Sequence, residues 1–454
     1  MTDDINQNGR NESDDAAKSS FMDELKKVTV DADKGREPKL LTSRMGTRQY
    51  SLAALMERIV DAFIDEHGGG SQPLREADTE TKRLKLILAT ADYVIAVESI
   101  ILTDDEKADI LRQVYAELFT YGPLDALFAD PTITTITLEG AEKVSVRYGH
   151  GELTPLDPLF DDEAHLRKMV KRLLLDSGAE LSPETPIIET GLLVERRPVS
   201  VNVAGPPVTY TINVDIRVHP AEPPTLDALV QDGYINTTAR DVLAALAHSP
   251  HGLIIVGETE SGKTTLLNAL AALLPAAQVV AVERAGELRL NEDALRLRVQ
   301  WPMEDREGLS FGQQITAALA ADRTVMLLDE VRADEAPAIG TLLAEAAVPR
   351  QLWTFRGPAD AKRLTSALGM LARRSTFVED GEARVRQLYH RLPFVLTLRR
   401  RKDMLQLYSI SEWQFAPGAA YPTLTELLVM GAEGLEVIGQ KPTLTLDLPA
   451  EFWG

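Results

Sequence analysis

The clearest chemistry in this sequence lies in eight residues that follow an apolar run. From Gly257 to Thr264 the chain reads Gly-Glu-Thr-Glu-Ser-Gly-Lys-Thr, with glycine at the first and sixth positions. In a loop of this spacing, backbone N–H groups surround the α and β phosphates of a nucleotide, the lysine reaches the β and γ phosphates, and the last hydroxyl binds Mg²⁺. The sequence therefore predicts a site for ATP and Mg²⁺, with these candidate binding residues: Gly257, Thr259, Ser261, Gly262, Lys263, Thr264 and Thr265.

A second group of candidate residues follows another apolar run. Val325–Leu328 lead directly into Asp329 and Glu330. At the tip of a buried strand, an aspartate can hold Mg²⁺ through water, and a glutamate can polarise the water that attacks the γ phosphate. We therefore predict Thr264 and Asp329 as metal ligands, and Glu330 as a catalytic residue.

The elements that must position these residues have the pattern of an α/β domain. Apolar runs at 253–256, 279–282 and 325–328 alternate with helical segments, as expected for a parallel sheet covered on both faces. We predict a RecA-like phosphate-loop domain. Near the C-terminus, Phe394–Leu398 and Leu405–Ile410 predict a hairpin whose basic tip, Arg399–Lys402, is a solvated turn or docks on an acidic membrane or partner.

Composition shifts divide the chain further. Helical spacing is present at 51–64, 79–99 and 103–119, and Thr103-Asp-Asp-Glu106 has the pattern of a capping box. Short alternating runs around one amphipathic helix predict a small α+β domain before a proline-rich connection. The predicted organisation is a disordered acidic tail (1–46), a helical N-terminal section (47–122), an α+β, PAS-like domain (123–219), a linker (220–226), the phosphate-loop domain (227–375) and a C-terminal subdomain with the hairpin (376–454).

The overall composition excludes some classes of function. The 454 residues include no cysteine, which excludes disulfides, thiolate zinc sites and a cysteine nucleophile. A net charge of −21 argues against a nucleic-acid motor and favours a protein partner, with solubility as the alternative reason for the acidity. Because the sequence has no long apolar run and no signal-peptide pattern, we expect a cytoplasmic protein without a transmembrane segment.

Several motifs, in order, resemble those of the secretion and type IV pilus assembly ATPases, most closely the tight-adherence (Flp pilus) branch. They are the segment Tyr121–Thr132, the stretch Val201–Pro207, the acidic box Val282–Leu288, and the segment Ser310–Ala336, which contains Glu330-Val-Arg332. A different resemblance, of Leu309–Gln314 to the signature of transporter-type ATPases, is disfavoured because too few residues separate it from Gly257 to hold the helical subdomain of those proteins.

The resemblance implies a motor subunit of a pilus or type II/IV secretion apparatus. Such subunits form a homo- or hetero-hexamer at the inner membrane face, work on a membrane platform protein, and clamp ATP between the α+β domain and the phosphate-loop domain. The resemblance also implies that Glu283 and Glu287 are catalytic, activating water or holding Mg²⁺, and that Glu330 is a metal ligand. It further implies that Arg217 reaches the nucleotide from the N-terminal domain and that Arg332 belongs to the binding site.

The chain departs from this family at the residues that carry the chemistry. Glu258 and Glu260 replace loop glycines, and the second position is expected to need a positive φ, which is unfavourable for glutamate. Arg284 replaces an acidic residue, and a histidine box has become Pro349–Arg356, where Arg350 or Arg356 could supply a missing cation. The family's arginines before the second acidic strand are replaced by Gly312, Thr316, Ala320 and Asp322.

These departures leave a second hypothesis open. The chain could be a degenerate paralogue that binds nucleotide weakly or not at all and acts as a regulatory or structural subunit of such a hexamer. The sequence therefore predicts an ATPase whose activity is reduced or lost.

Overall fold

The computed structural model describes residues 40–42, 49–68, 71–332, 336–344, 348–357, 360–376, 380–401, 404–419, 421–431 and 434–453. The chain forms two compact units. Unit 1 is Met1–Asp130 with Leu159–Leu173, and unit 2 is Pro131–Pro158 with Leu174–Gly454. Apart from 40–42, the predicted tail (1–46) lies outside the described residues, as do residues 333–335 of the Glu330–Ala336 motif and Lys402 in the hairpin tip.

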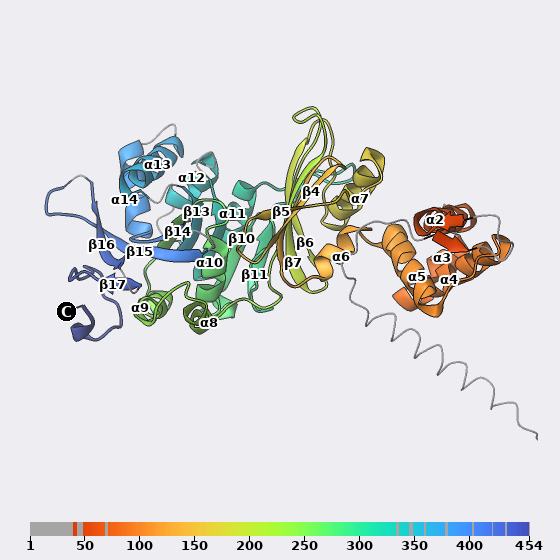
Figure 1. The fold of residues 1–454 in the computed structure, drawn as a ribbon. Coiled ribbons are helices and arrows are strands. Elements are labelled where there is room, and N and C mark those ends of the chain that lie inside the picture. The colour runs from red at the N-terminus through yellow and green to blue at the C-terminus, as the bar shows by residue number, and fades with distance from the viewer. Residues whose placement is uncertain are drawn as a thin grey trace, which may run out of the picture. The chain divides into compact units, whose positions relative to one another are not determined.

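The described part of unit 1 is mainly helical (Figure 1). A short antiparallel hairpin of β1 (Leu40–Thr42) and β2 (Gln49–Ser51) precedes the helices. The helices are α2 (Leu52–His67), α3 (Gln72–Glu76), α4 (Glu80–Val97), α5 (Asp104–Phe119), α6 (Leu124–Ala129) and most of α7 (Glu163–Asp176). Apolar residues at helical spacing, such as Leu55 and Ile59 of α2 and Ile87 of α4, form one buried cluster.

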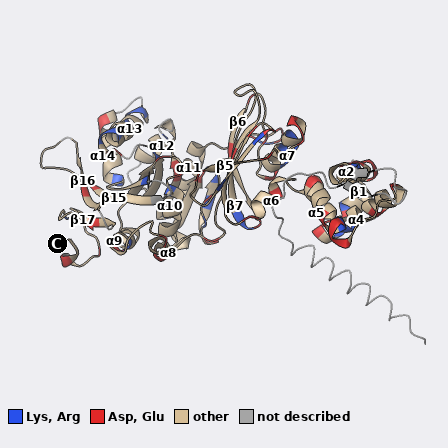
Figure 2. Cartoon of the chain, in the orientation of Figure 1, with Lys and Arg blue, Asp and Glu red and all other residues tan. Residues whose placement is uncertain are grey.

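The predicted capping box at the start of α5 is confirmed. The Thr103 hydroxyl accepts a hydrogen bond from the Glu106 N–H at 3.3 Å, and the Glu106 carboxylate accepts one from the Thr103 N–H at 3.0 Å. Acidic residues fill the first turn of α5, where negative charge is favourable (Figure 2).

Unit 2 contains two sheets. The smaller one has the strand order β5-β4-β3-β8-β7-β6, and all neighbours are antiparallel. Its strands are β3 (Ile133–Glu139), β4 (Lys143–Tyr148), β5 (Leu153–Leu156), β6 (Ile187–Val194), β7 (Arg197–Ala204) and β8 (Asn213–Val218).

The larger sheet has the order β11-β10-β12-β13-β9-β14-β15-β16-β17. It is parallel from β11 to β14 and antiparallel from β14 onward, so the predicted hairpin extends the same sheet that carries the phosphate loop. Its strands are β9 (Leu253–Gly257), β10 (Val279–Glu283), β11 (Leu295–Arg298), β12 (Val325–Val331), β13 (Arg350–Arg356), β14 (Phe394–Arg401), β15 (Met404–Gln414), β16 (Thr423–Met430) and β17 (Leu435–Val437).

Helices cover both faces of the parallel part of this sheet, as predicted (Figure 1). Alternate residues of β9 enter opposite cores: Leu253 and Ile255 pack with α8, α9 and α10, whereas Ile254 and Val256 pack with the other helices. The helices are α8 (Leu226–Gln231), α9 (Thr237–His248) and α10 (Lys263–Ala271) on the first face, and α11 (Phe311–Ala320), α12 (Ala336–Ala344), α13 (Ala361–Arg374) and α14 (Gly381–Arg391) on the second.

Two short 3₁₀ turns, Ala276–Gln278 and Ala450–Trp453, complete the elements of the described chain. No helix of the described residues is long and apolar enough to cross a membrane.

Candidate functional site

The predicted loop joins the end of β9 to the start of α10. Gly262 is the N-cap of α10 with φ of 84°, and a Cβ on it would lie 2.8 Å from the hydroxyl oxygen of Tyr234. A Cβ on Gly257 would lie 2.3 Å from Ser261 Oγ. Both positions therefore require glycine, because the backbone turns with no room for a side chain. Because the loop leads directly into α10, the N–H groups of the loop and the N-terminus of α10 lie together at the carboxyl end of β9.

Lys263 is a deeply buried cation. Its side chain is 5 % exposed, and Nζ donates a hydrogen bond of 2.8 Å to the backbone carbonyl of Glu258. Nζ also lies 3.8 Å from a carboxylate oxygen of Glu330. Burial lowers the pKa of Lys263, so a second negative charge at this position would favour its protonated form.

Thr264 and Asp329 come together as the sequence predicts. The Thr264 hydroxyl donates to Asp329 Oδ1 at 3.2 Å, and the Thr354 hydroxyl donates to the same oxygen at 2.8 Å. Burial raises the pKa of Asp329 well above its usual value, and the carboxylates of Glu287, Glu283 and Glu330 add to this effect. A divalent cation would relieve this concentration of negative charge, so the donor set fits Mg²⁺.

The described residues contain no group of three or more His, Cys, Asp or Glu side chains that could hold a metal by themselves. A magnesium ion at Thr264 and Asp329 would therefore need further ligands from water or phosphate, which is how Mg²⁺ is commonly bound.

The remaining predicted loop residues are Ser261, Thr259 and Thr265. Ser261 Oγ is buried and has no hydrogen-bond partner among the described residues. Thr259 lines a cavity of about 320 Å³ together with Glu258, Arg356 and Gly357. Thr265 is half-buried in the first turn of α10.

Glu283 does not face this opening. Its side chain is fully buried, and its carboxylate accepts hydrogen bonds from the Leu288 N–H at 2.8 Å and from Arg296 Nε and Nη2 at 2.8 and 3.2 Å. In this conformation Glu283 links β10 to β11 and to the turn that follows β10. Both carboxylate oxygens of Glu283 accept hydrogen bonds. Its catalytic role stays a prediction.

Glu287 lies beside a histidine that the sequence did not single out. Its carboxylate is 3.6 Å from His219 Nε2, and that nitrogen is 3.0 Å from Ser200 Oγ. Burial alone would raise the pKa of Glu287, but His219, Ser200 and Arg217 outweigh burial and lower it to about 2. Glu287 is therefore an ionised carboxylate at neutral pH.

The two predicted arginines differ in their surroundings. Arg217 Nε lies 3.5 Å from Asp215 and 3.9 Å from Glu260 in the loop. Arg332 Nη2 donates to both carboxylate oxygens of Glu189, at 2.7 and 2.6 Å, and its Nε donates to Glu330 at 3.2 Å. Arg217 thus lies close to a residue of the phosphate loop, whereas Arg332 is paired with carboxylates, and the binding role of both arginines stays a prediction.

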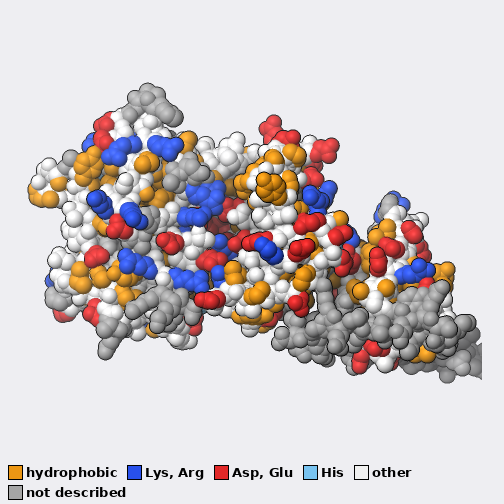
Figure 3. All heavy atoms as spheres, turned by 45° about the horizontal axis from the view of Figure 1, so that its top comes forward, with side chains coloured by type: hydrophobic (Ala, Val, Ile, Leu, Met, Phe, Trp, Pro, Cys, Tyr) orange, Lys and Arg blue, Asp and Glu red, His pale blue; other side chains and the backbone are white. Residues whose placement is uncertain are grey.

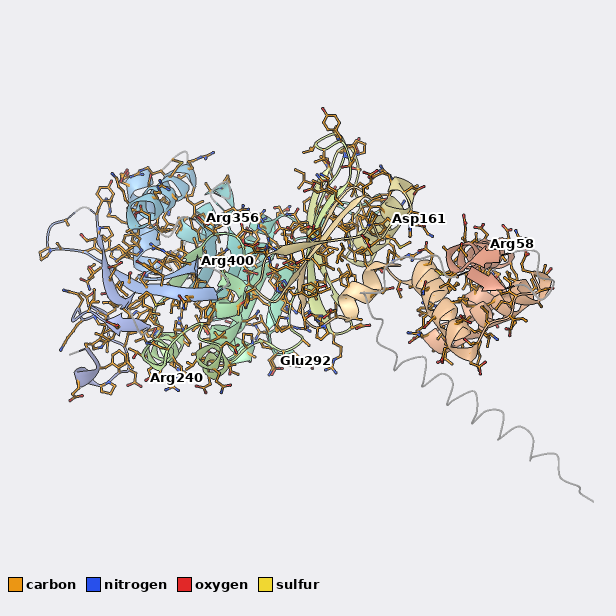
Figure 4. All side chains as sticks on the ribbon, in the orientation of Figure 1. Arg58, Asp161, Arg240, Glu292, Arg356 and Arg400 are labelled. Atoms are coloured by element: carbon orange, nitrogen blue, oxygen red, sulfur yellow. The ribbon has the colours of Figure 1, made fainter. Side chains whose placement is uncertain are left out.

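The sequence correctly predicts the backbone at Glu260, which has φ of 58°. It does not predict the partners of this residue. The Glu260 carboxylate lies 2.5 Å from Arg147 Nη1 and 3.6 Å from Arg400 Nη1. Arg400, which is labelled in Figure 4, belongs to the predicted hairpin tip. It also donates to the His150 carbonyl at 2.6 Å, so this part of the tip is not simply solvated.

The structure corrects one further expectation. Arg350 cannot supply a cation to the phosphates, because it opens β13 at the end of the sheet opposite the loop. Its guanidinium donates to the carbonyls of Leu246, Ala247 and His251. Arg356, at the other end of β13, pairs in register with Gly257 and remains a candidate. Lys and Arg side chains gather beside acidic ones on the visible face of unit 2 (Figure 3).

The strand, glycine-bounded loop and helix, together with Lys263 and the Thr264–Asp329 pair, have the arrangement of a phosphate-loop fold. Residues 183–345 match the family model described as type II/IV secretion system protein. This part of the chain is therefore similar to the type II/IV secretion system protein family.

Individual proteins are also similar to parts of this chain. A putative conjugal transfer protein of Mycobacterium tuberculosis is 32% identical over 192 residues, which are 41% of this chain and 54% of that protein. The type IV secretion system protein PtlH of Bordetella pertussis is 34% identical over 100 residues, 21% of this chain and 30% of PtlH. The chain thus spans about half or less of the length of these curated relatives.

Two solved structures are also similar. The ATPase DotB of Legionella pneumophila has a TM-score of 0.43 at 15% identity, covering 63% of this chain and 77% of DotB. The pilus retraction motor PilT with bound ADP has a TM-score of 0.42 at 18% identity, covering 65% of this chain and 78% of PilT.

Proposed function

We propose that this chain is an ATP-binding and ATP-hydrolysing motor subunit of a pilus assembly or secretion machine, of the tight-adherence type. The observation that carries the proposal is the set Lys263, Thr264 and Asp329 at one end of a parallel sheet, with a hydroxyl and a buried carboxylate 3.2 Å apart. We further propose that it works in the cytoplasm as a homo- or hetero-hexamer, on a platform protein of the inner membrane.

In this proposal each residue has a defined task. The loop N–H groups and Lys263 bind the phosphates, and Thr264 with Asp329 would hold Mg²⁺. The bound metal ion would neutralise charge on the transferring phosphoryl group. Glu330, half-buried and 3.8 Å from Lys263 Nζ, orients the attacking water, and Arg217 brings a cation from the smaller sheet to the phosphates.

Specific observations favour a second candidate, a regulatory subunit with little or no turnover. Glu260 places a carboxylate in the phosphate cradle, and Glu283 is paired with Arg296. The exposed positions Thr316 and Ala320 on α11 carry none of the family's arginines. A missing arginine of this kind can lower the rate of phosphoryl transfer by several orders of magnitude.

Steady-state hydrolysis of Mg·ATP beside a calorimetric binding titration separates the two candidates. The motor proposal expects binding and measurable turnover in the wild-type chain, with both lost in Lys263→Ala. Binding without turnover would favour the regulatory subunit, and the absence of binding in the wild type would refute the nucleotide site itself.

A further inference from the structure

The carboxylate of Glu260 is surrounded by arginines from three different strands. Arg147 on β4 lies 2.5 Å away, Arg400 on β14 lies 3.6 Å away and Arg217 on β8 lies 3.9 Å away. The side chain of Glu260 is only 24% exposed, and that of Arg147 only 14%. Attraction between such partly buried charges is much stronger than between charges in open solvent.

These arginines have more capacity for anions than the protein supplies. Three guanidinium groups face two carboxylates, those of Glu260 and Asp215. Nε of Arg147 is buried and has no hydrogen-bond partner within the described residues, and Nε of Arg217 is held only at long range, 3.5 Å from Asp215 and 3.9 Å from Glu260. Buried donors of this kind are normally satisfied, so the cluster can accept a further oxyanion.

Glu260 is also held where the backbone disfavours it. Its φ of 58° is costly for a residue with a side chain, by about 1 kcal/mol or more. The ion pair with Arg147 offsets this cost in the nucleotide-free chain. A phosphate entering the loop would bring negative charge close to the same carboxylate and compete for the same guanidinium groups.

We propose that Glu260 is an internal anion that occupies the arginine cluster in the nucleotide-free subunit and sets its discrimination between nucleoside triphosphates and diphosphates. The inference rests on the proposed function, because the competing ligand is the nucleotide of this loop. The triphosphate carries one more charged group than the diphosphate, so Glu260 repels the triphosphate more strongly. For the same reason the triphosphate gains more when Glu260 no longer occupies the arginines. Glu260 therefore weakens ATP binding more than ADP binding.

Glu258 provides a matched control within the same loop. It has the same charge two residues earlier, it is exposed, and no ion pair of its carboxylate is found in the described chain. Glu260→Gln removes the charge and keeps the side chain at positive φ, whereas Glu260→Gly removes both the charge and the strain. Comparison of the two variants separates electrostatic competition from backbone strain.

The test is a titration of wild type, Glu260→Gln, Glu260→Gly and Glu258→Gln with Mg·ATP, Mg·ADP and pyrophosphate at constant ionic strength. We expect Glu260→Gln to bind Mg·ATP about tenfold more tightly or better, with a smaller gain for Mg·ADP. Glu258→Gln should change both affinities less and by similar factors. Equal gains for ATP and ADP in Glu260→Gln, or gains no larger than those of Glu258→Gln, would overturn the proposal.

A second measurement needs no nucleotide. Urea unfolding of Glu260→Gln, Arg147→Gln and the double variant gives the coupling between the two side chains. We expect the two losses of stability to be strongly non-additive. If the two losses of stability add, the Glu260–Arg147 ion pair contributes nothing and the inference fails even where ATP binds. If the coupling is present but neither wild type nor Glu260→Gln binds ATP, the proposed function fails, and with it the competition between Glu260 and the nucleotide.

Discussion

Removing the guanidinium of Arg296 should destabilise the chain through Glu283. The Glu283 side chain is fully buried, and in Arg296→Met its carboxylate would keep only the hydrogen bond from the Leu288 N–H at 2.8 Å. Leaving one partner of a buried ion pair alone costs about 3–5 kcal/mol. Because the Arg296 side chain is 33% exposed, solvent screening reduces this loss, and we expect about 2–3 kcal/mol.

Arg298 is the control for this substitution. It is also exposed and lies two residues further on the same strand, and its guanidinium donates a long hydrogen bond of 3.5 Å to the Gly191 carbonyl. Arg298→Met should therefore cost no more than about 0.5 kcal/mol. Urea unfolding followed by circular dichroism gives both values from the midpoints at constant slope.

The double variant decides what Glu283 does. If the carboxylate is structural, Glu283→Gln in the Arg296→Met background should recover part of the lost stability, because a neutral amide is less costly to bury than a charge. Equal losses for Arg296→Met and Arg298→Met, or no recovery in the double variant, would refute the structural role. The predicted catalytic role would then be the better account of this residue.

Three further predictions concern other parts of the molecule. Asp329→Asn should raise the stability of the nucleotide-free chain by about 1 kcal/mol at neutral pH, because burial raises the pKa of the Asp329 carboxyl, and thermal unfolding checks this. The same variant should abolish the effect of Mg²⁺ on ATP affinity, which titrations with and without Mg²⁺ measure. Glu189→Gln should leave Arg332 with Glu330 as its carboxylate partner and cost about 1 kcal/mol or more in urea unfolding, since Arg332 donates to both Glu189 oxygens. An unchanged midpoint would show that the Glu189–Arg332 pair contributes nothing to stability. In unit 1, a hydrogen bond from His165 to Glu117 raises the pKa of His165 above 6.5. The contribution of this pair to stability is therefore full below pH 6.5 and is lost as pH rises through the folded-state pKa of His165. His165→Gln should remove that decline, and a wild-type stability that does not fall over this pH range would contradict the prediction.

The parts of the site that the sequence predicts are those encoded by neighbouring residues. The loop from Gly257 to Thr264 and the capping box at Thr103 are local patterns whose geometry depends on backbone turns and on hydrogen bonds a few residues apart. The positive φ at Glu260 follows in the same way, because the loop shape requires it whatever residue is present. The pairing of Asp329 with Thr264 is predictable because parallel strands end at one edge of the sheet.

The partners that change the interpretation come from distant segments. Arg147 and Glu260 are 113 residues apart in the chain, and Glu189 and Arg332 are 143 residues apart. A single arginine or glutamate on an alternating strand has no local pattern that identifies its partner, since the pair forms only when the smaller sheet meets the loop. The same reason explains why Glu283 resembles a catalytic residue in the sequence while Arg296 binds it in the structure.

Single-turnover hydrolysis of γ-labelled Mg·ATP, with the protein in excess, tests the central claim most directly. It detects the chemical step even when release of product limits steady-state turnover. We expect release of phosphate in a slow single phase in the wild type and none in Lys263→Ala. A wild-type chain that binds Mg·ATP but releases no more phosphate than Lys263→Ala would contradict the motor function.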